Sequence, residues 1–354
     1  MRIVVGISGG VDSALAAALL QERGFDVVGC FLKVELSTLN SQLSTCPWRE
    51  DLPMAHRVAA HLNIPLVVKD VSAEYEREVL EPMVAAYRAG ETPNPDTMCN
   101  RWVKFDALAA VARTVDAERI ATGHYARVCR RSHEYANVHE STNTRIHPLH
   151  LSPSRLEGEL EGEGFVELHR GLDHVKDQSY FLATLTQKQL VACEFPLGEW
   201  RKEDVRVEAK RRGFPNWDRH STSGVCFIGH VDLAQFLAAR TAVTPATVVT
   251  TTGEVIGVVP AGEAMTIGQR VPVAGQPVPR YVVATEPAAQ RIVVSASMDD
   301  PARYTSVIHA TAPNWIGASP FVSPPPTGRR SERGWGTVHC SARIRHRQEP
   351  QPCT

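Results

Sequence analysis

The sequence predicts an α/β protein with a parallel sheet covered by helices on both faces, followed by a smaller β-rich unit and a C-terminal β-rich unit. Strand-like and helix-like segments alternate through the first half of the chain, which is typical of parallel sheets because each strand needs a crossover helix. After about residue 240, runs rich in Val and Thr are broken by Gly and Pro, as in antiparallel β structure. A glycine-rich loop separates the first expected strand from the first expected helix.

Each element of the first half follows from its hydrophobic pattern and its stop signal. Residues 2–6 form a short apolar run typical of a buried strand, and residues 13–23 form a helical pattern that a glycine ends. A longer helical pattern, 73–88, stops at Gly90 and Pro93. The other expected strands are 26–34, 65–71 and 119–123, and the other expected helices are 54–62, 102–115, 179–193, 202–212 and 231–240.

Two later regions differ from this alternation. Residues 130–169 are rich in His, Ser, Asn and Glu and have little periodicity, so we expect a surface insertion there. The Val- and Thr-rich runs 244–259, 280–284 and 290–297 and the alternating segment 337–347 are expected to be strands. The expected domains are 1–235 with the insertion, 236–300 and 301–354.

The bulk composition excludes several classes of protein. The formal net charge is -1, so a polyanion needs a local patch; segment 329–349 has six Arg and two Glu, although charge alone makes it more simply a solvated face. The sequence contains no stretch of about 18 apolar residues, so no membrane span is expected. The chain opens directly into an expected strand rather than a signal peptide. The eight cysteines form no C-x-x-C pair, which argues against a zinc or iron–sulfur site. A long chain without a secretion signal favours a reducing, cytoplasmic location.

A phosphate-binding loop is expected where the first strand meets the first helix. Its residues are Gly6, Ile7, Ser8, Gly9, Gly10, Val11, Asp12 and Ser13. Glycines let the backbone approach a phosphate, N–H groups at a helix start attract anions, and the serine hydroxyls add donors. Asp12 can help to hold a magnesium ion that bridges phosphates. A ligand-free turn would be the simpler interpretation of two glycines alone, but the full S-G-G-x-D-S pattern favours phosphate.

Two segments place a cysteine in a setting that allows chemistry. Pro95 bars helix continuation, and a new helix is expected to begin near Cys99, where backbone N–H groups favour a thiolate. Asp96 is close enough in sequence to share a pocket and move a proton. A helix cap at Asp96 and a small packing residue at Cys99 fit the local pattern equally well. Cys226 joins a flexible polar segment to a short apolar one, where a buried structural cysteine is the simpler interpretation.

Taken together, these motifs resemble the MnmA (TrmU) family of tRNA-specific 2-thiouridylases, within the PP-loop ATP pyrophosphatases. The loop lacks the lysine of G-x-x-x-x-G-K-[ST], and N-P-D-x-x-C-N and G-x-C-F-I-G follow it in the family's order. Further matches are A-T-G-H-Y at 121–125, G-L-D at 171–173, K-D-Q-S-Y-F-L at 176–182, T-I-G-Q-R at 266–270 and R-H-R-Q at 345–348. The resemblance covers most of 1–129 and 170–354. It implies an adenine nucleotide alpha hydrolase-like (PP-loop) domain, a small β-rich central domain and a C-terminal β-barrel.

The resemblance also implies roles for the matched residues. The loop residues, with Leu32 and Gly123, would bind ATP. Cys226 would carry a persulfide, Cys99 would be the nucleophile that pairs with it in a transient disulfide, and Asp96 would act as acid and base. The residues implied to contact tRNA are Asn94, Pro95, Asp96, His124, Lys176, Asp177, Gln178, Arg345, His346 and Gln348.

The implied reaction uses ATP with Mg²⁺, a wobble uridine of tRNA and a sulfur donor, and no resident metal ion. Adenylation makes the C2 oxygen of uracil part of AMP, and the Cys226 persulfide supplies the sulfur. Cys99 attacks the sulfur–sulfur bond or releases sulfide, and a Cys99–Cys226 disulfide remains for an external reductant. The base must leave its stack to be reached. The family implies tRNAs for Lys, Glu and Gln and a persulfide relay from a cysteine desulfurase.

Alternatives and departures accompany this prediction. A PP-loop amide-forming ligase would need no cysteine pair, and an inactive tRNA-binding protein would form no product. On local pattern alone, Lys176 and Arg345 are simpler as surface ion pairs and His124 as a core histidine. The insertion is longer than the family usually has, Met265 stands where the family commonly has His, and the chain stops at Thr354, where the family continues with more strands. The C-terminal barrel is therefore expected to be truncated.

Overall fold

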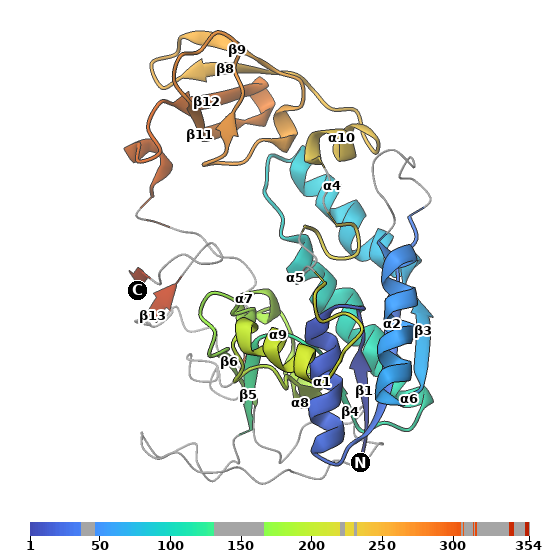
Figure 1. Ribbon diagram of the computed structural model, residues 1–354. Helices are drawn as coiled ribbons and strands as arrows, with labels where there is room; N and C mark the ends of the chain where they lie inside the picture. Colours follow the sequence, from blue (N-terminus) through green and yellow to red (C-terminus); the bar gives the residue numbers. More distant parts are fainter. Residues whose placement is uncertain are drawn as a thin grey trace, which may run out of the picture.

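The computed structural model describes residues 1–36, 47–130, 166–219, 224–229, 232–305, 307, 314, 316, 340–342 and 351–353. Within these residues, a parallel sheet forms in the first part of the chain and a separate β-rich sheet follows (Figure 1). The structure confirms the predicted order, in which an α/β unit is followed by a β-rich unit. The domain boundaries at 235 and 300 stay predictions. None of the described helices is both long and apolar enough to cross a membrane.

The parallel sheet has the strand order β3-β2-β1-β4-β7, and all neighbouring strands are parallel. Its strands are β1 (Arg2–Gly6), β2 (Asp26–Lys33), β3 (Leu66–Asp70), β4 (Arg119–Ala121) and β7 (Cys193–Glu194). In β1, Ile3 and Val5 face one hydrophobic core and Val4 faces the other. Because both faces are covered, the strand is apolar throughout rather than alternating.

Helices cover both faces of this sheet. On one face lie α1 (Val11–Glu22), α2 (Trp48–Leu62) and α9 (Lys202–Arg211). The hydrophobic core on the other side is built by α3 (Ser72–Tyr75), α4 (Glu81–Arg88), α5 (Pro95–Cys99), α6 (Phe105–Thr114), α7 (Ser179–Leu182), α8 (Gln187–Val191) and α10 (Leu233–Ala238). Of these, α10 lies beside α4 toward the second sheet rather than over the parallel sheet (Figure 1). The buried Ala and Leu side chains of α1 give that helix close contact with the sheet. The core is thus divided into two layers by β1, whose carboxyl end leads into the predicted phosphate loop.

Three predicted helices differ in detail from the observed ones. The helix expected at 73–88 contains a π-helical turn, Glu76–Leu80, between α3 and α4. The helix expected at 102–115 begins earlier, at Pro95, because the Asn94 side chain caps it and proline is tolerated at the first helical position. The helix expected at 179–193 is two short helices and a strand, because a capping box at Thr186 starts α8 anew.

A two-stranded antiparallel ribbon flanks the predicted insertion. It pairs β5 (Ala126–Arg130) with β6 (Val166–Arg170). Val128 and Leu168 pack against the core of the parallel sheet. Most of the insertion, 131–165, lies outside the described residues.

The second sheet has the order β10-β11-β12-β8-β9, in which only β12 and β8 are parallel among the described strands. Its strands are β8 (Ala246–Thr250), β9 (Val255–Val259), β10 (Arg270–Val271), β11 (Arg280–Glu286) and β12 (Arg291–Ser295). Short 3₁₀ turns occur at Gly262–Ala264, Pro287–Ala289 and Pro301–Arg303. Thr92 contacts Thr266 at 3.2 Å, so this sheet meets the first unit at the loop after α4.

The C-terminal region contributes one described ribbon. It pairs β13 (Cys340–Ala342) with β14 (Gln351–Cys353) in antiparallel register. The strand expected at 337–347 is described only at β13, and the rest of the predicted β-barrel, with the basic segment 329–349, lies largely outside the described residues.

Candidate active site

The carboxyl ends of β1, β2 and β4 meet at one edge of the parallel sheet. The order of the strands reverses between β1 and β4, and open α/β sheets form a crevice at such a point. A cavity of about 410 Å³ opens there. Its lining includes Ser8, Asp12 and Ser13 from the phosphate loop, and also Asp96 and Cys226. Segments that are far apart in the sequence therefore share one cavity.

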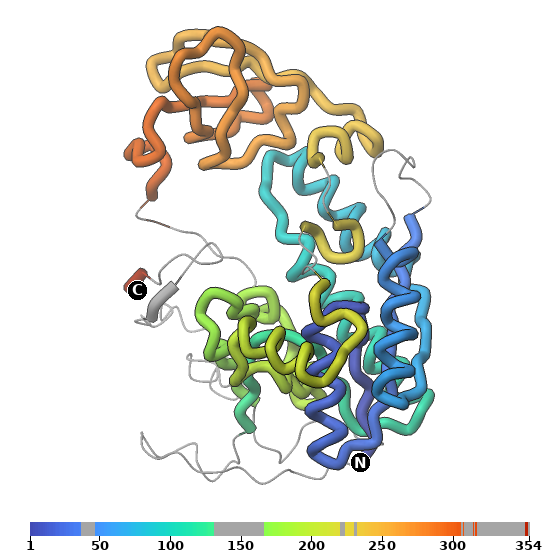
Figure 2. Tube along the Cα trace, viewed as in Figure 1, coloured from blue at the N-terminus to red at the C-terminus, as the bar shows by residue number. Residues whose placement is uncertain are grey.

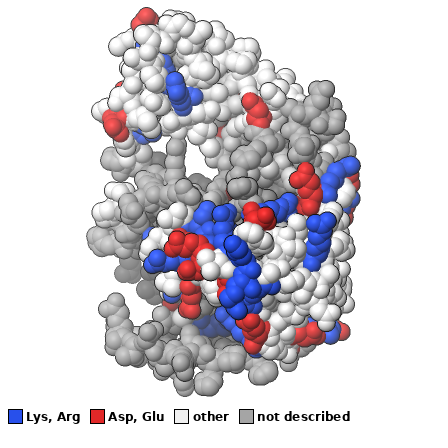
Figure 3. All heavy atoms as spheres, in the orientation of Figure 1, with Lys and Arg blue, Asp and Glu red and all other residues white. Residues whose placement is uncertain are grey.

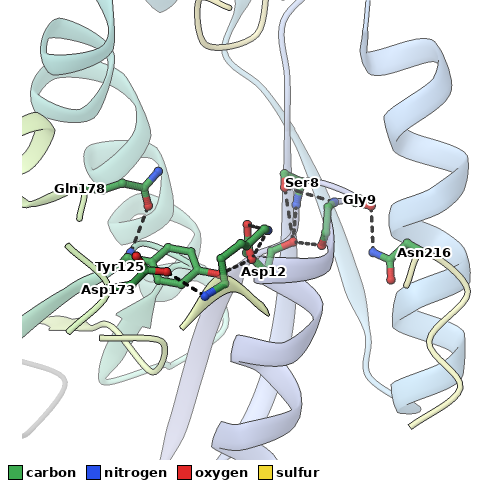
Figure 4. Close-up of polar contacts among 10 residues, drawn as sticks. Ser8, Gly9, Asp12, Tyr125, Asp173, Gln178 and Asn216 are labelled. Carbon is green, nitrogen blue, oxygen red and sulfur yellow. Dashed lines mark hydrogen bonds and ion pairs between the residues drawn. The ribbon is translucent and has the colours of Figure 1, made fainter. Parts of the chain in front are cut away.

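The phosphate loop is shaped by its own residues (Figure 4). Gly9 has a φ of +78°, a left-handed conformation that glycine adopts without strain. The Ser13 hydroxyl accepts a hydrogen bond from the Ser8 backbone N–H at 3.2 Å and donates one to the Gly10 carbonyl at 2.9 Å. The loop is therefore held open before the first turn of α1, as an anion site at a helix start requires.

Neighbouring segments anchor the outer side of the loop. Asn216 Nδ2 donates to the Gly9 carbonyl at 2.9 Å, and Arg219 pairs with Asp51 at 2.6 Å. Ile7 and Val11 are buried in the hydrophobic core. These two predicted ligand residues can therefore act only through their backbone.

Asp12 has two polar partners that sequence reasoning missed. Lys202 Nζ lies 2.6 Å from both carboxylate oxygens of Asp12, and Tyr125 donates its hydroxyl proton to the same carboxylate at 2.7 Å. Figure 4 shows Asp12 and Tyr125 pointing toward one another. Burial lowers the pKa of Lys202, while Asp12 opposes that change. Because Lys202 and Asp12 are 190 residues apart, no local sequence signal could have joined them.

Leu32 and Gly123, the two other residues predicted to bind ATP, both line the cavity. A Cβ atom at Gly123 would lie 2.8 Å from the backbone carbonyl carbon of Asp12 and the backbone nitrogen of Ser13. Only glycine lets the end of β4 approach the phosphate loop so closely.

Cys226 lies on a tight turn between Val225 and Gly229, whose backbones exchange hydrogen bonds at 3.0 and 2.8 Å. Phe227 in this turn has a φ of +65°, which is strained for a residue with a side chain. Tyr75 holds the turn: its ring meets Phe227 edge-on at 5.6 Å, and its hydroxyl donates to the Cys226 carbonyl at 2.6 Å. Figure 2 shows the chain before α10 running between α4 and α5.

The turn brings Cys226 to the predicted acid/base residue and to the second cysteine. The Asp96 carboxylate accepts a hydrogen bond from the Cys226 backbone N–H at 3.0 Å, across 130 residues of sequence. The thiols of Cys99 and Cys226 lie close enough for each to shift the pKa of the other, and both cysteines are free. Lys104 Nζ lies 4.0 Å from Cys226 Sγ.

The two thiols differ in their acidity. Burial raises the pKa of Cys99 well above its ordinary value, and its hydrogen bond with Cys226 raises it further. The same hydrogen bond lowers the pKa of Cys226; burial opposes this change, and the charge of Lys104 adds to it. Cys226 is therefore the more acidic of the two thiols.

This result corrects the sequence argument for Cys99. The helix starts at Pro95, so Cys99 ends the short helix α5 rather than standing at a helix start, and its side chain is fully buried. It has no thiolate favoured by a helix N-terminus. Asp96 also does not cap the helix, because Asn94 does so by accepting from the N–H groups of Asp96 and Thr97 at 3.2 and 3.3 Å.

Two more residues predicted to contact tRNA line the same cavity. His124 stacks on Phe105 with ring centroids 6.0 Å apart, and its Nδ1 lies 2.7 Å from the Thr122 hydroxyl. Burial, followed by the charge of Lys104, lowers the pKa of His124 well below its usual range, so the ring is neutral. Gln178 accepts a hydrogen bond from the Tyr125 backbone N–H at 3.0 Å.

The remaining residues predicted to contact tRNA differ in exposure, and some lie outside the described residues. Lys176 is exposed, whereas Asp177 is buried and accepts from the Gly171 N–H at 3.1 Å and the Ser179 hydroxyl at 3.0 Å. Both contacts stay predictions, and Asp177 first shapes its own loop. Arg345, His346 and Gln348 lie outside the described residues. Figure 3 shows Lys and Arg side chains, mixed with acidic ones, gathered around α7 and α9 on the face in view.

One group of side chains among the described residues could hold a metal ion. The ligand atoms of Cys129, Glu167 and His169 lie within 4.8 Å of one another on β5 and β6. None of the three lines the cavity. Asp12 of the phosphate loop lines the cavity, and its role toward a magnesium ion carried with ATP stays a prediction.

The family model and the related proteins of known name agree on one family. Residues 1–230 match the family model described as the tRNA methyl transferase HUP domain. The chain is 35% identical over 361 residues to a protein of Psychromonas ingrahamii named tRNA-specific 2-thiouridylase MnmA, covering 100% of this chain and 86% of that protein. A protein of the same name from Halorhodospira halophila is 36% identical over 358 residues, covering 99% and 82%. The structure of NMN synthetase from Francisella tularensis, at 15% identity, covers 62% of this chain and 66% of its own with a TM-score of 0.36.

Proposed function

The chain belongs to the family of tRNA-specific 2-thiouridylases (MnmA), and we propose that it replaces the C2 oxygen of the wobble uridine in tRNA with sulfur, at the expense of ATP. One observation carries this proposal: the Cys226 thiol and the Asp96 carboxylate line the same cavity as the phosphate loop, and the buried thiol of Cys99 lies next to Cys226. A phosphate loop alone serves many ATP-cleaving enzymes. Paired thiols beside it suit a reaction in which the activated atom is replaced by sulfur.

The phosphate loop activates the base. Its N–H groups and serine hydroxyls hold the ATP phosphates while the C2 oxygen attacks the α phosphate, and pyrophosphate leaves. Gly123 keeps the end of β4 against the loop, and Leu32 contacts the adenosine part. Asp12 would offer a carboxylate oxygen to a magnesium ion carried with ATP, which would neutralise part of the phosphate charge. The carbon now bears an adenylate as leaving group.

The thiols then deliver sulfur. Cys226 carries the persulfide, because its pKa is lowered while that of Cys99 is raised, and the thiolate is the form that attacks sulfur. In one route the terminal sulfur of the persulfide attacks C2 and AMP departs, and Cys99 then attacks the Cys226 sulfur and breaks the sulfur–sulfur bond. In the other route Cys99 attacks the Cys226 sulfur first, and the terminal sulfur leaves as sulfide, which attacks C2 and displaces AMP. A Cys99–Cys226 disulfide remains, and an external reductant restores both thiols. Asp96, whose carboxylate accepts a hydrogen bond from the Cys226 N–H, acts as the acid and base that transfers protons during these steps.

The same proposal includes the tRNA contacts, the tRNAs that are modified and the source of the sulfur. Asn94 and Pro95 meet the target base, and Lys176, Gln178 and His124 contact the tRNA around it. Arg345, His346 and Gln348 add contacts from the C-terminal region. The tRNAs are those for Lys, Glu and Gln, the sulfur comes by a persulfide relay from a cysteine desulfurase, and the reaction takes place in the cytoplasm.

Nucleoside mass spectrometry tests the function directly. The chain is incubated with unmodified tRNA, ATP, magnesium and a persulfide donor, and the digested tRNA is searched for 2-thiouridine. Formation of 2-thiouridine and AMP is expected, and both Cys99→Ser and Cys226→Ser should abolish the thiolated product. An amide-forming ligase would retain full activity in both variants. An inactive binding protein would retain tRNA but form no product with intact cysteines, and either outcome would reject the proposal.

A further inference from the structure

A lysine ammonium lies beside the two thiols, although the sequence motifs gave it no role. Lys104 Nζ is 4.0 Å from Cys226 Sγ and donates a hydrogen bond to Asn100 Oδ1 at 2.8 Å. Asn100 is itself buried, and its Nδ2 donates to the Phe181 carbonyl at 3.0 Å. The ammonium is therefore fixed by an amide that cannot turn away without losing its own hydrogen bond.

Local helix geometry brings Lys104 to this place. Lys104 is five positions after Cys99, which would set the two residues about 140° apart around a regular α-helix. A π-helical turn, Asn100–Lys104, lies between them and brings residues at this spacing onto nearer sides of the axis. Such turns are frequent at functional sites. The sequence spacing alone would have assigned Lys104 to a different face.

The charges around the thiols leave a defined role for the ammonium. Asp96 disfavours a second negative charge on Cys226, whereas Lys104 favours it, and the neutral His124 adds none. Tyr75, also packed here, has its pKa raised far above its usual range by burial and by the neighbouring thiols, so it stays protonated. Burial alone would lower the pKa of Lys104, but Cys226, Cys99 and Asp96 raise it, so Lys104 is charged at neutral pH.

We propose that Lys104 is a further catalytic residue, whose ammonium holds the Cys226 sulfur as a thiolate and so makes Cys226 the cysteine that accepts sulfur. This inference rests on the function proposed above. The Cys226 thiolate attacks the terminal sulfur of a donor persulfide. A sulfur–sulfur bond forms at Cys226 as the donor's own sulfur–sulfur bond breaks. The donor leaves as a thiolate that takes a proton from water, so it is reduced to a thiol while Cys226 becomes the persulfide.

The pH profile of alkylation tests the inference without tRNA or ATP. The full chain is treated with iodoacetamide over a pH series, and modification of Cys226 and Cys99 is followed separately by peptide mass spectrometry. In Lys104→Met the midpoint for Cys226 should rise by about one to three pH units, because an opposite charge at this distance shifts a pKa by that amount. Lys104→Arg should restore most of the shift. Lys210→Met is the matched control, since Lys210 is exposed beside Trp217, and it should leave the midpoint unchanged.

Two results would overturn the inference. One is an unchanged Cys226 midpoint in a folded Lys104→Met chain, with folding checked by circular dichroism. The other result comes from the unmutated chain and is used if Lys104→Met does not fold. Cys226 should have a lower alkylation midpoint than Cys99, and the reverse order would contradict the inference. Failure of the proposed function is a separate event: it shows as absence of 2-thiouridine from the unmutated chain, whatever the alkylation midpoints are.

Discussion

The two ends of the cavity are built in opposite ways. At the phosphate end, a single stretch of eight residues, 6–13, forms the loop, and hydrogen bonds between Ser8, Ser13 and Gly10 fix its shape. At the thiol end, Cys226 meets Asp96 and Cys99 through contacts that cross more than one hundred residues of sequence. The first end is preorganised by local backbone, whereas the second exists only once the whole unit has folded.

The difference also concerns charge. The phosphate end pairs its carboxylate, Asp12, with Lys202, so that a negative charge does not face an incoming polyanion unopposed. The thiol end does the reverse with Lys104, which favours a negative charge on Cys226. One cavity therefore prepares for an anionic substrate at one end and for an anionic nucleophile at the other.

The largest expected effect is loss of sulfur transfer with ATP cleavage retained, which tests whether the two ends of the cavity act independently. Cys226→Ser should lower 2-thiouridine formation by at least about 1000-fold, because an alcohol cannot carry the persulfide. The same variant should still cleave ATP to AMP and pyrophosphate in the presence of tRNA, measured by pyrophosphate release. Ser13→Ala, at the phosphate end, should lower both activities together. If Cys226→Ser also stopped pyrophosphate release, the two ends would not act independently.

A smaller effect is expected from the ion pair at the phosphate end. Lys202→Met leaves the Asp12 carboxylate without its cation, so it repels the ATP phosphates. The value of kcat/KM for ATP should fall about 10- to 100-fold, equivalent to about 1.4–2.8 kcal/mol, as measured by steady-state pyrophosphate release. Lys202→Arg should keep most of the activity. The Cys226 alkylation midpoint should not move in either variant, and a shift there would show that the ends are electrostatically coupled.

The packing between β4 and the phosphate loop gives a third test, of stability. Gly123→Ala places a Cβ 2.8 Å from backbone atoms of Asp12 and Ser13. The backbone must move, and the free energy of unfolding should fall by about 1–3 kcal/mol. Gly6→Ala is the control, since its Cβ would meet the Leu108 side chain at an ordinary 3.4 Å. Urea unfolding measures both, and equal losses would contradict the close approach at Gly123.

The smallest effect concerns the helix that carries Lys202. Glu208 on α9 pairs with Arg211 and Arg212, and Arg212 in turn pairs with Glu22 of α1. The hydrogen bond from Arg211, supported by Arg212, lowers the pKa of Glu208 to about 2 from the ordinary 4.5. A lowered carboxyl pKa stabilises the fold above the unfolded pKa, and this contribution is lost as pH falls through the folded pKa.

Glu208→Gln should therefore reduce the free energy of unfolding by no more than about 1 kcal/mol at neutral pH, since such pairs near the surface are worth little. The difference from the parent chain should shrink as pH falls from about 4.5 toward about 2, the range between the two pKa values. Thermal unfolding across that range measures it. A difference that grows with falling pH would show that Glu208 acts in another way.

Much of the fold could be predicted from the sequence because it depends on local patterns. The apolar run at β1, the glycine-rich loop and the helix that follows are contiguous, and each has its own signal. The break between α7 and α8 was missed, because the capping box at Thr186 is weaker than the apolar periodicity around it. The start of α5 at Pro95 differs from the expected start at residue 102, because proline bars a preceding helix from continuing but also fits a first helical turn.

The sequence by itself determined the phosphate loop and marked Cys99, Asp96 and Cys226 as chemically interesting, since those signals reside in short motifs. Only the tertiary structure decided which thiol is the more acidic, because acidity depends on burial and on charges brought from elsewhere in the chain. The roles of Lys202 and Lys104 belong to the same class. Each is an ordinary lysine in the sequence, and each acquires its partner only when the chain closes around the cavity.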